Sequence, residues 1–176
     1  MSISTGLGDD GSTELFAGQF VPKDHPRIEF IGVLDELNSF LGDAKAAALR
    51  EQTRTIIETV QRDIFAAPLL LAYPDKEPTT GGGMLPKGGG IDPERLAALI
   101  SELEERRPLK GFVVPGKNAA SAKLDIARTV CRRAERRLIA LSREETVPPL
   151  LRRYMNRLSD LLFMLARAEE DDGDEK

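Results

Sequence analysis

The densest group of chemically capable side chains in this 176-residue sequence is a basic run, residues 127–137, which reads ARTVCRRAERR. With residues placed at about 100° each around a helix, Arg133 and Arg137 rotate outward, and five other charged side chains in and just before this run share an arc of about 100°. They are Asp125, Arg128, Arg132, Glu135 and Arg136. The arc borders an apolar stripe, where charges are tolerated only when paired or bound. Because arginines beside a carboxylate suit polyphosphate oxygens, the run predicts an anion site; a solvated basic face is the alternative.

Two further segments carry polar residues beside apolar stripes of helical spacing. In the segment that begins at residue 27 these are Asp35, Asn38 and Gly42. In the segment that begins at residue 149 they are Asn156, Ser159, Asp160 and Phe163. Asp35 either pairs with an arginine of the basic run or lies in water. An asparagine beside a core is more often structural than catalytic, so the role of Asn156 stays open.

Residues that perform covalent catalysis or bind transition metals are scarce. His25 is the only histidine and Cys131 the only cysteine. These two residues provide neither a metal-ligand cluster nor a hydrolase triad. We therefore expect a substrate or cofactor to supply the reactive atom.

The composition restricts the setting in which this chemistry takes place. A net charge of −4 and a pI near 5.2 favour neither nucleic acid nor an anionic membrane as a partner. A single cysteine rules out an intramolecular disulfide and fits a reducing compartment. The chain has no N-terminal apolar signal and no run of about 18 apolar residues. We expect a cytoplasmic protein that binds no nucleic acid and crosses no membrane.

Helical periodicity dominates the chain from residue 27 to residue 170. Apolar stripes predict helices from Arg27, over residues 57–71 with a kink or end at Pro68, from Asp92-Pro93, from near Asn118 and from Pro148-Pro149. No convincing strand is present, and aromatic residues make up only 5% of the chain, which disfavours a sandwich or barrel. The sequence therefore predicts an all-α protein, a five-helix bundle.

Less regular stretches flank and interrupt the predicted bundle. Residues 1–26 are rich in glycine and polar side chains, and we expect them to be extended and partly ordered. The Gly/Pro-rich stretch between Tyr73 and Ile91 predicts a mobile surface loop. We divide the chain into an N-terminal segment (1–26), a bundle domain (27–170) and an acidic tail (171–176).

Two glycine-rich stretches match nucleotide-binding motifs incompletely. Residues 6–11 fit G-x-G-x-x-G, but only five residues precede them, too few for the strand that the motif requires. Residues 111–118 are one residue short of a Walker A loop, and a helical pattern precedes them. We expect neither fold, although glycine-rich backbone and Lys117 are still able to bind phosphate.

Six motifs occur together in an order that resembles the PduO-type ATP:cob(I)alamin adenosyltransferases. They are TGLGDDGST (5–13), PKD (22–24), DELN (35–38), FVVPG (112–116), ARTVCRRAER (127–136) and NRLSD (156–160). They span residues 5 to about 168, nearly the whole chain. The resemblance implies a ferritin-like five-helix bundle that forms homotrimers, with active sites between subunits.

The resemblance also implies roles for individual residues. The N-terminal segment folds over ATP, and the triphosphate, bridged by Mg²⁺, lies against Lys23 and the basic run. The implied ATP-binding residues are Thr5, Gly6, Leu7, Gly8, Asp9, Thr13, Lys23, Arg132, Arg133, Glu135, Arg136 and Asn156. An ion pair between Asp35 and Arg128 shapes the corrinoid site, and Phe112 presses on the lower face of the corrin. The implied catalytic residues are Arg132, Arg128, Asp35 and Glu135.

The implied reaction is attack of cobalt, reduced to Co(I), on the 5′ carbon of ATP, with release of triphosphate. Co(I) is a strong nucleophile and needs no general base, which fits the shortage of histidine. A reductase and an adenosylcobalamin-dependent acceptor enzyme are possible partners. One alternative is a degenerate paralogue that binds ATP or corrinoid for delivery with little turnover, and a remote one is a structural helix-bundle module.

The sequence departs from the family pattern at four positions. Gly6 stands where the family usually has Lys or Arg, and Leu7 where it has Thr. Asp125 replaces a common His, and Lys117 replaces the second glycine of P-G-G. Loss of one charge-assisted phosphate contact costs about 1.5–3 kcal/mol, so we expect weaker ATP binding, partly compensated by Lys117.

Overall fold

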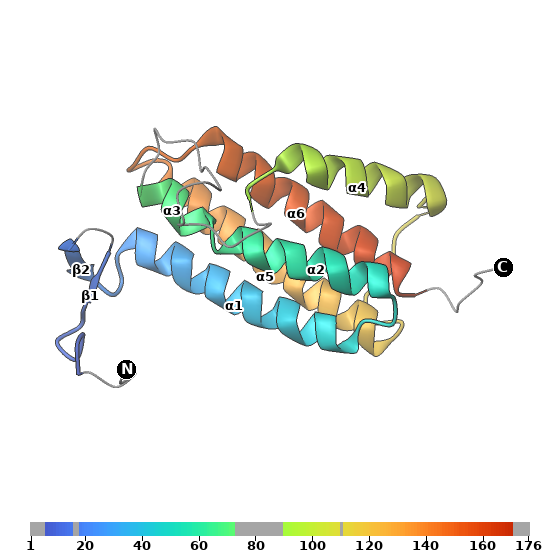
Figure 1. Ribbon diagram of the computed structural model, residues 1–176, viewed down its shortest axis with the longest axis horizontal. Helices are drawn as coiled ribbons and strands as arrows, with labels where there is room; N and C mark the ends of the chain where they lie inside the picture. Colours follow the sequence, from blue (N-terminus) through green and yellow to red (C-terminus); the bar gives the residue numbers. More distant parts are fainter. Residues whose placement is uncertain (1–5, 16–17, 73–89, 110, 171–176) are drawn as a thin grey trace.

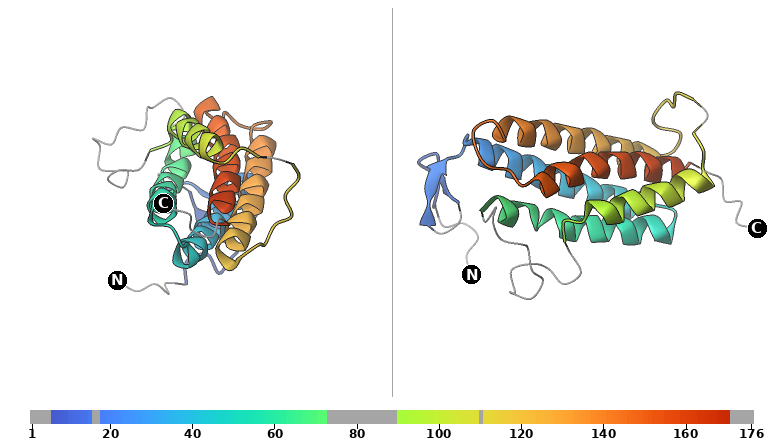
Figure 2. Two further views of the ribbon diagram at one scale, coloured as in Figure 1. Left: turned by 90° about the vertical axis from the view of Figure 1, so that its right-hand side faces the viewer. Right: turned by 90° about the horizontal axis from the view of Figure 1, so that it is seen from above.

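The computed structural model describes residues 6–15, 18–72, 90–109 and 111–170. Five long helices lie along one axis around a common apolar core (Figures 1 and 2): α1 (Pro26–Ala47), α2 (Glu51–Ile64), α4 (Pro93–Arg106), α5 (Ala119–Leu141) and α6 (Pro149–Ala168). Helix α1 packs against α2 and α5, and α6 packs against α5 and α4. The predicted all-α five-helix bundle is confirmed.

Three of the long helices, α1, α4 and α5, begin at capping side chains, whereas α2 begins at Glu51, six residues before the predicted stripe. The Nδ1 atom of His25 accepts a hydrogen bond from the backbone N–H of Arg27 and caps α1. A carboxylate oxygen of Asp92 accepts from two backbone N–H groups at 3.0 Å at the start of α4. Asn118 and Ser121 form a reciprocal capping box on α5. These three starts lie within one residue of the predicted ones.

The second predicted helix is interrupted, as Pro68 suggested. Helix α2 ends at Ile64, and the short α3 (Ala67–Ala72) follows with Pro68 in its first turn. The fully buried Asp63 braces this break: it accepts hydrogen bonds from the Tyr154 hydroxyl (2.7 Å) and the Gly90 backbone N–H (2.8 Å) and pairs with Arg95. One carboxylate thus joins α2, α4 and α6.

The expectation that the chain contains no strand was wrong for the N-terminal segment. Strand β1 (Ser12–Glu14) pairs antiparallel with β2 (Phe20–Pro22), with Thr13 opposite Val21. Each strand is three residues long, too short to produce an alternating pattern that a sequence scan detects. The hairpin lies beyond the end of the bundle at which α1 begins (Figure 1).

Some expectations fall on residues outside the described ranges. These are the body of the predicted loop (73–89), the acidic tail (171–176) and Thr5. None of the helices in the described ranges combines the length and the apolarity needed to span a lipid bilayer.

Candidate functional site

Helices α5 and α6 bring the predicted polar residues of both helices together. Arg128 and Arg132 lie one turn apart on α5, and α6 returns alongside it. The two arginines line a cavity of about 170 Å³ with Ser159, Asp160 and Phe163 of α6. The apolar stripes beneath them, Leu124 to Leu138 and Leu151 to Leu165, are buried and fix this face.

Exposed cations extend the cavity toward the C-terminal end of α5. Arg132 and Arg136 are exposed, and neither forms an ion pair with a residue in the described ranges. Asn156 is exposed one turn before Ser159, and Glu135 is half-buried on α5. Arginines without an internal counter-charge are available to bind an anion from outside.

Two other arginines of the basic run lie on the face of α5 that packs against α1. Arg133 forms an ion pair with Glu36, and Arg137 lies 3.1 Å from a carboxylate oxygen of Glu29. Both partners belong to α1, so these arginines join α1 to α5. The structure therefore separates Arg133 from Arg132, although both were expected to bind ATP.

Asp125 lies beneath Arg128 and is buried. One of its carboxylate oxygens accepts a hydrogen bond from Arg128 Nε (3.1 Å), and the other accepts from Arg167 Nη2 (2.6 Å). Arg167 was missed in the sequence, where the only signal is a charged residue in the last turn of an otherwise apolar helix. The Arg128 guanidinium expected to pair with Asp35 is thus engaged by Asp125 within its own helix.

The N-terminal glycine-rich residues form a compact turn ahead of the hairpin. Gly8 has a φ of +90°, and its carbonyl oxygen accepts a hydrogen bond from the Gly11 backbone N–H (3.1 Å). The Gly11 carbonyl oxygen in turn accepts one from the Lys23 backbone N–H (2.9 Å). A Cβ atom added to Gly8 would lie 2.8 Å from the Ser12 carbonyl oxygen and 3.3 Å from Lys23 Nζ. Close packing at Gly8 therefore sets the position of Lys23. Gly6, Leu7 and Asp9 of the same turn are exposed.

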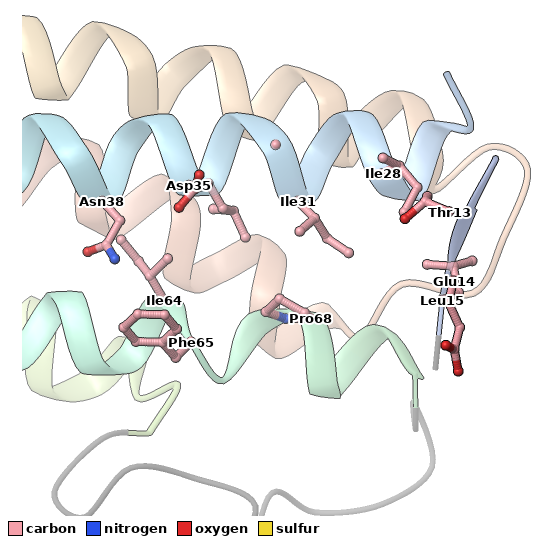
Figure 3. A pocket seen from close by; sticks show the side chains of 12 residues that line it. Thr13, Glu14, Leu15, Ile28, Ile31, Asp35, Asn38, Ile64, Phe65 and Pro68 are labelled. Atoms are coloured by element: carbon pink, nitrogen blue, oxygen red, sulfur yellow. The ribbon is translucent and has the colours of Figure 1, made fainter. Parts of the chain in front are cut away.

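A larger cavity of about 540 Å³ lies between α1, the α2–α3 break and β1 (Figure 3). Its walls are mainly apolar, with Ile28, Ile31 and Phe65 among them, and Thr13 lies at its edge. Asp35 and Asn38 add polar groups from α1, and the buried Oδ1 of Asn38 has no hydrogen-bond partner within the described residues. Asp35 is exposed here and makes no contact with Arg128 of the same chain.

The α4–α5 connection lies at the end of the bundle opposite to the hairpin (Figures 1 and 2). It contains Phe112, whose side chain is 96% exposed, and Lys117. Lys117 Nζ donates a hydrogen bond to the Glu170 backbone oxygen (2.6 Å), at the C-terminal end of α6. The expected compensation of Gly6 by Lys117 is not supported within one chain, because the two residues lie at opposite ends.

The predicted site residues therefore form three separate groups in one chain. The first is the α5–α6 face with Arg128, Arg132 and Asn156; the second is the turn and hairpin with Gly8 and Lys23; the third is the exposed Phe112. No part of the chain in the described ranges brings the first two groups to a common cavity. A site that uses all three must join different chains.

Burial of the Cys131 side chain disfavours the thiolate form that a nucleophile needs. Burial raises the pKa of the Cys131 thiol well above its ordinary value, and its Sγ lies 3.5 Å from the Met155 carbonyl oxygen.

Hydrogen bonds from Ser12 lower the pKa of Asp10 in the N-terminal turn. In the described ranges, no three His, Cys, Asp or Glu side chains gather into a metal-binding group.

Comparisons of the sequence and of the structure with known proteins find matches among the cobalamin and corrinoid adenosyltransferases. Residues 3–169 match the family model of cobalamin adenosyltransferases. A corrinoid adenosyltransferase of Citrobacter freundii is 43% identical, covering 96% of this chain and 94% of its own. The structure of a variant PduO-type ATP:corrinoid adenosyltransferase from Lactobacillus reuteri, complexed with cobalamin and ATP, matches with a TM-score of 0.79 and 30% identity, over 96% of this chain and 91% of that one.

Other relatives are longer than this chain. The corrinoid adenosyltransferase PduO of Salmonella typhimurium is 43% identical over 98% of this chain, but the match covers 51% of that protein. The chain thus spans about half the length of this relative and of a second PduO from Citrobacter freundii.

Proposed function

The chain belongs to the cobalamin adenosyltransferase family, and we propose that it transfers the 5′-deoxyadenosyl group of ATP to the Co(I) of a reduced corrinoid. The observation that carries this proposal is the exposed pair Arg132 and Arg136, without internal partners among the described residues, beside the cavity lined by Arg128. Such a cluster suits a triphosphate leaving group.

We propose that ATP binds between two chains of a homotrimer. One chain contributes the α5–α6 face with Arg132, Arg136 and Asn156. A neighbour contributes the N-terminal segment, residues 1–26, with its turn around Gly8 and the Lys23 ammonium. The separation of these groups within one chain supports a shared site, since a cyclic interface brings different surfaces of two subunits together.

In this reaction the cobalt–carbon bond forms as the bond from C5′ to the triphosphate oxygen breaks. The electron pair of that bond leaves with the triphosphate, whose developing charge the arginines and Lys23 stabilise. Glu135, the one carboxylate of the basic run, would help to hold Mg²⁺ beside the triphosphate, and the metal would supply further positive charge to the leaving group. No side chain has to remove a proton, which fits a site built from positioning and charge.

The corrinoid would bind on the apolar side of the shared site. Phe112 is almost fully exposed, and the cavity near Asp35 is mainly apolar. Both features suit the large, mostly apolar face of a corrin ring. In the assembly Asp35 would meet Arg128 of a neighbouring chain. A reductase would deliver the electron, and an adenosylcobalamin-dependent enzyme would accept the product, in a reducing cytoplasm.

An anaerobic assay tests this proposal. Cobalamin is reduced chemically to Co(I), Mg-ATP and the protein are added, and loss of the Co(I) absorbance is followed together with triphosphate release. We expect turnover that depends on the protein and on ATP, with one triphosphate per adenosylated corrinoid. Tight binding of ATP or corrinoid without turnover would contradict the proposal and favour the degenerate paralogue, whose motivation is the absence of a phosphate-binding side chain at Gly6.

A further inference from the structure

A chain of three charged side chains runs from the interior of the bundle to the arginine-lined cavity. Arg167 on α6 is 6% exposed and Asp125 on α5 is 4% exposed. The two carboxylate oxygens of Asp125 are divided between two arginines: Oδ2 accepts from Arg167, and Oδ1 accepts from Arg128 Nε. Only Arg128, the last member, reaches the cavity.

The ring of Phe163 reinforces this arrangement from the side. The guanidinium carbon of Arg128 lies 5.9 Å from the ring centroid, and that of Arg167 lies 4.9 Å from it. Contacts of this kind between a guanidinium and an aromatic face favour a parallel stack. Together with the Asp125 bond they limit the rotamers open to Arg128. The structure records no partner within the described residues for the two terminal nitrogens of Arg128.

We propose that Asp125 is a positioning residue for the transfer reaction, an inference that rests on the proposed function. By binding Nε of Arg128, it directs the two terminal nitrogens of that guanidinium into the cavity, where they would meet Asp35 of a neighbouring chain and shape the site of the corrinoid. Arg167 supplies the second cation that holds Asp125 in place, because a buried carboxylate is tolerated only with paired charges. Asp125 itself does not line the cavity that Arg128 and Arg132 share.

This role explains why a carboxylate is suited to position 125. A carboxylate accepts hydrogen bonds from two arginines at once, one on each oxygen. A neutral histidine has one acceptor nitrogen and carries no negative charge, so it would leave one of the two guanidinium groups without an acceptor at position 125. The departure from the family pattern at Asp125 is thereby matched to Arg167 on the facing helix.

A double-mutant cycle tests whether Asp125 acts through Arg128. The variants are Asp125→Asn, Arg128→Ala and the double variant, measured in the Co(I) assay for kcat and for the KM of each substrate. Asp43→Asn is the matched control, since Asp43 also pairs with a cation of α5, Lys123, at the exposed α1–α5 edge. Thermal melts establish that each variant is folded.

We expect Asp125→Asn to lower kcat/KM by about tenfold and Asp43→Asn to leave it unchanged. The loss in Asp125→Asn should appear in the same quantity, kcat or the KM of one substrate, that Arg128→Ala changes. In the Arg128→Ala background the Asp125→Asn change should have no further effect beyond about twofold. Losses that multiply in the double variant, or a loss of melting temperature without a kinetic effect, would overturn the proposal. An inactive wild type would instead refute the proposed function and leave the positioning question to the next measurement.

A measurement on the wild type serves if Asp125→Asn does not fold. Hydrogen exchange of arginine Nε–H groups is followed by NMR, with the signals assigned from Arg128→Ala and Arg132→Ala. We expect the Arg128 Nε–H to exchange at least about tenfold more slowly than that of the exposed Arg132, because it is bonded to a buried carboxylate. Equal exchange rates would overturn the positioning role whatever the activity of the protein.

Discussion

At the scale of single residues, the arginines of the basic run differ by the partner that each one has. Arg133 and Arg137 pair with carboxylates of α1, Arg128 pairs with Asp125, and Arg132 and Arg136 have no ionic partner among the described residues. Helical spacing predicted that Arg132 and Arg137 lie on different faces of the helix, and the structure agrees. The sequence could not reveal which arginines pair with a carboxylate of the same chain, because the partners of Arg133 and Arg137 lie on another helix.

The first residue-scale prediction compares Arg132 with Arg137. We expect Arg132→Ala to lower kcat/KM for ATP by at least about tenfold, because a charge-assisted contact with the leaving triphosphate is lost. Arg137→Ala removes a half-exposed ion pair with Glu29, which contributes at most about 1 kcal/mol to stability and nothing to the site. Steady-state measurement of kcat/KM for ATP in both variants tests this prediction. Equal losses of activity would mean that the active face of α5 is misplaced.

The second residue-scale prediction concerns the close packing at Gly8. In Gly8→Ala the new Cβ would meet the Ser12 carbonyl oxygen and the end of Lys23, so the ammonium must shift. We expect the KM for ATP to rise by about tenfold, as for the loss of one charge-assisted contact, with the KM for corrinoid unchanged. Gly11→Ala is the control, since Gly11 has a φ of +86° but no atom within 4 Å of an added Cβ. Similar effects of both substitutions would assign the defect to backbone strain and refute the role of Lys23.

At the scale of elements, the sequence predicted the helices well because their signals are local. Apolar stripes and capping residues such as Asp92 and Asn118 act within one or two turns. The hairpin of the N-terminal segment was missed, because strands of three residues have no periodicity to detect. The bracing role of Asp63 was missed as well, since its partners Tyr154 and Gly90 are distant in the sequence.

The element-scale prediction tests that brace with Tyr154→Phe. The buried carboxylate of Asp63 would lose a hydrogen bond to a charged group, which contributes about 1.5–3 kcal/mol. For a chain of this size the melting temperature at pH 7 should fall by roughly 5 °C. Ser39→Ala, which removes an exposed hydroxyl bonded within its own helix, should leave the melting temperature unchanged.

The loss of stability in Tyr154→Phe should depend on pH, and the pKa of Asp63 gives the sign of that dependence. Burial raises the pKa of Asp63 above its ordinary value of 3.8, so folding takes up a proton between that value and the raised one. The contribution of Asp63 to the free energy of unfolding therefore falls as pH rises from 3.8 through the raised pKa. Loss of the tyrosine donor raises the pKa further, so the difference between wild type and Tyr154→Phe should be small near pH 4 and grow toward neutral pH. Thermal melts that show a pH-independent difference would refute an ionised Asp63 as the partner.

At the scale of the whole molecule, the site was only partly predictable. The residues of the α5–α6 face follow from helical spacing, and the structure brings Arg128, Arg132 and Asp160 to one cavity. The resemblance assigned Gly8, Lys23 and Phe112 to that same site, yet one chain keeps them at separate places. Helical spacing carries no information about how subunits meet, so the assembly stays a prediction.

We expect a homotrimer in solution. Sedimentation equilibrium at micromolar concentration should give a mass about three times the 19.3 kDa of the chain, as for a closed cyclic assembly. A monomer at all concentrations tested would contradict the shared site, because the proposed site needs the α5–α6 face of one chain and the N-terminal segment of another.

The central claim, that adenosyl transfer occurs at a site shared between chains, is tested most directly by subunit complementation. Lys23→Ala damages only the N-terminal contribution and Arg132→Ala only the α5–α6 contribution, so each homotrimer should lose at least about tenfold in kcat/KM for ATP in the Co(I) assay. When the two variants are co-expressed in equal amounts, about a quarter of the interfaces of a randomly mixed cyclic trimer contain both intact halves. The account predicts recovery of about a quarter of wild-type activity. A mixture no more active than the mean of its two parents would contradict it.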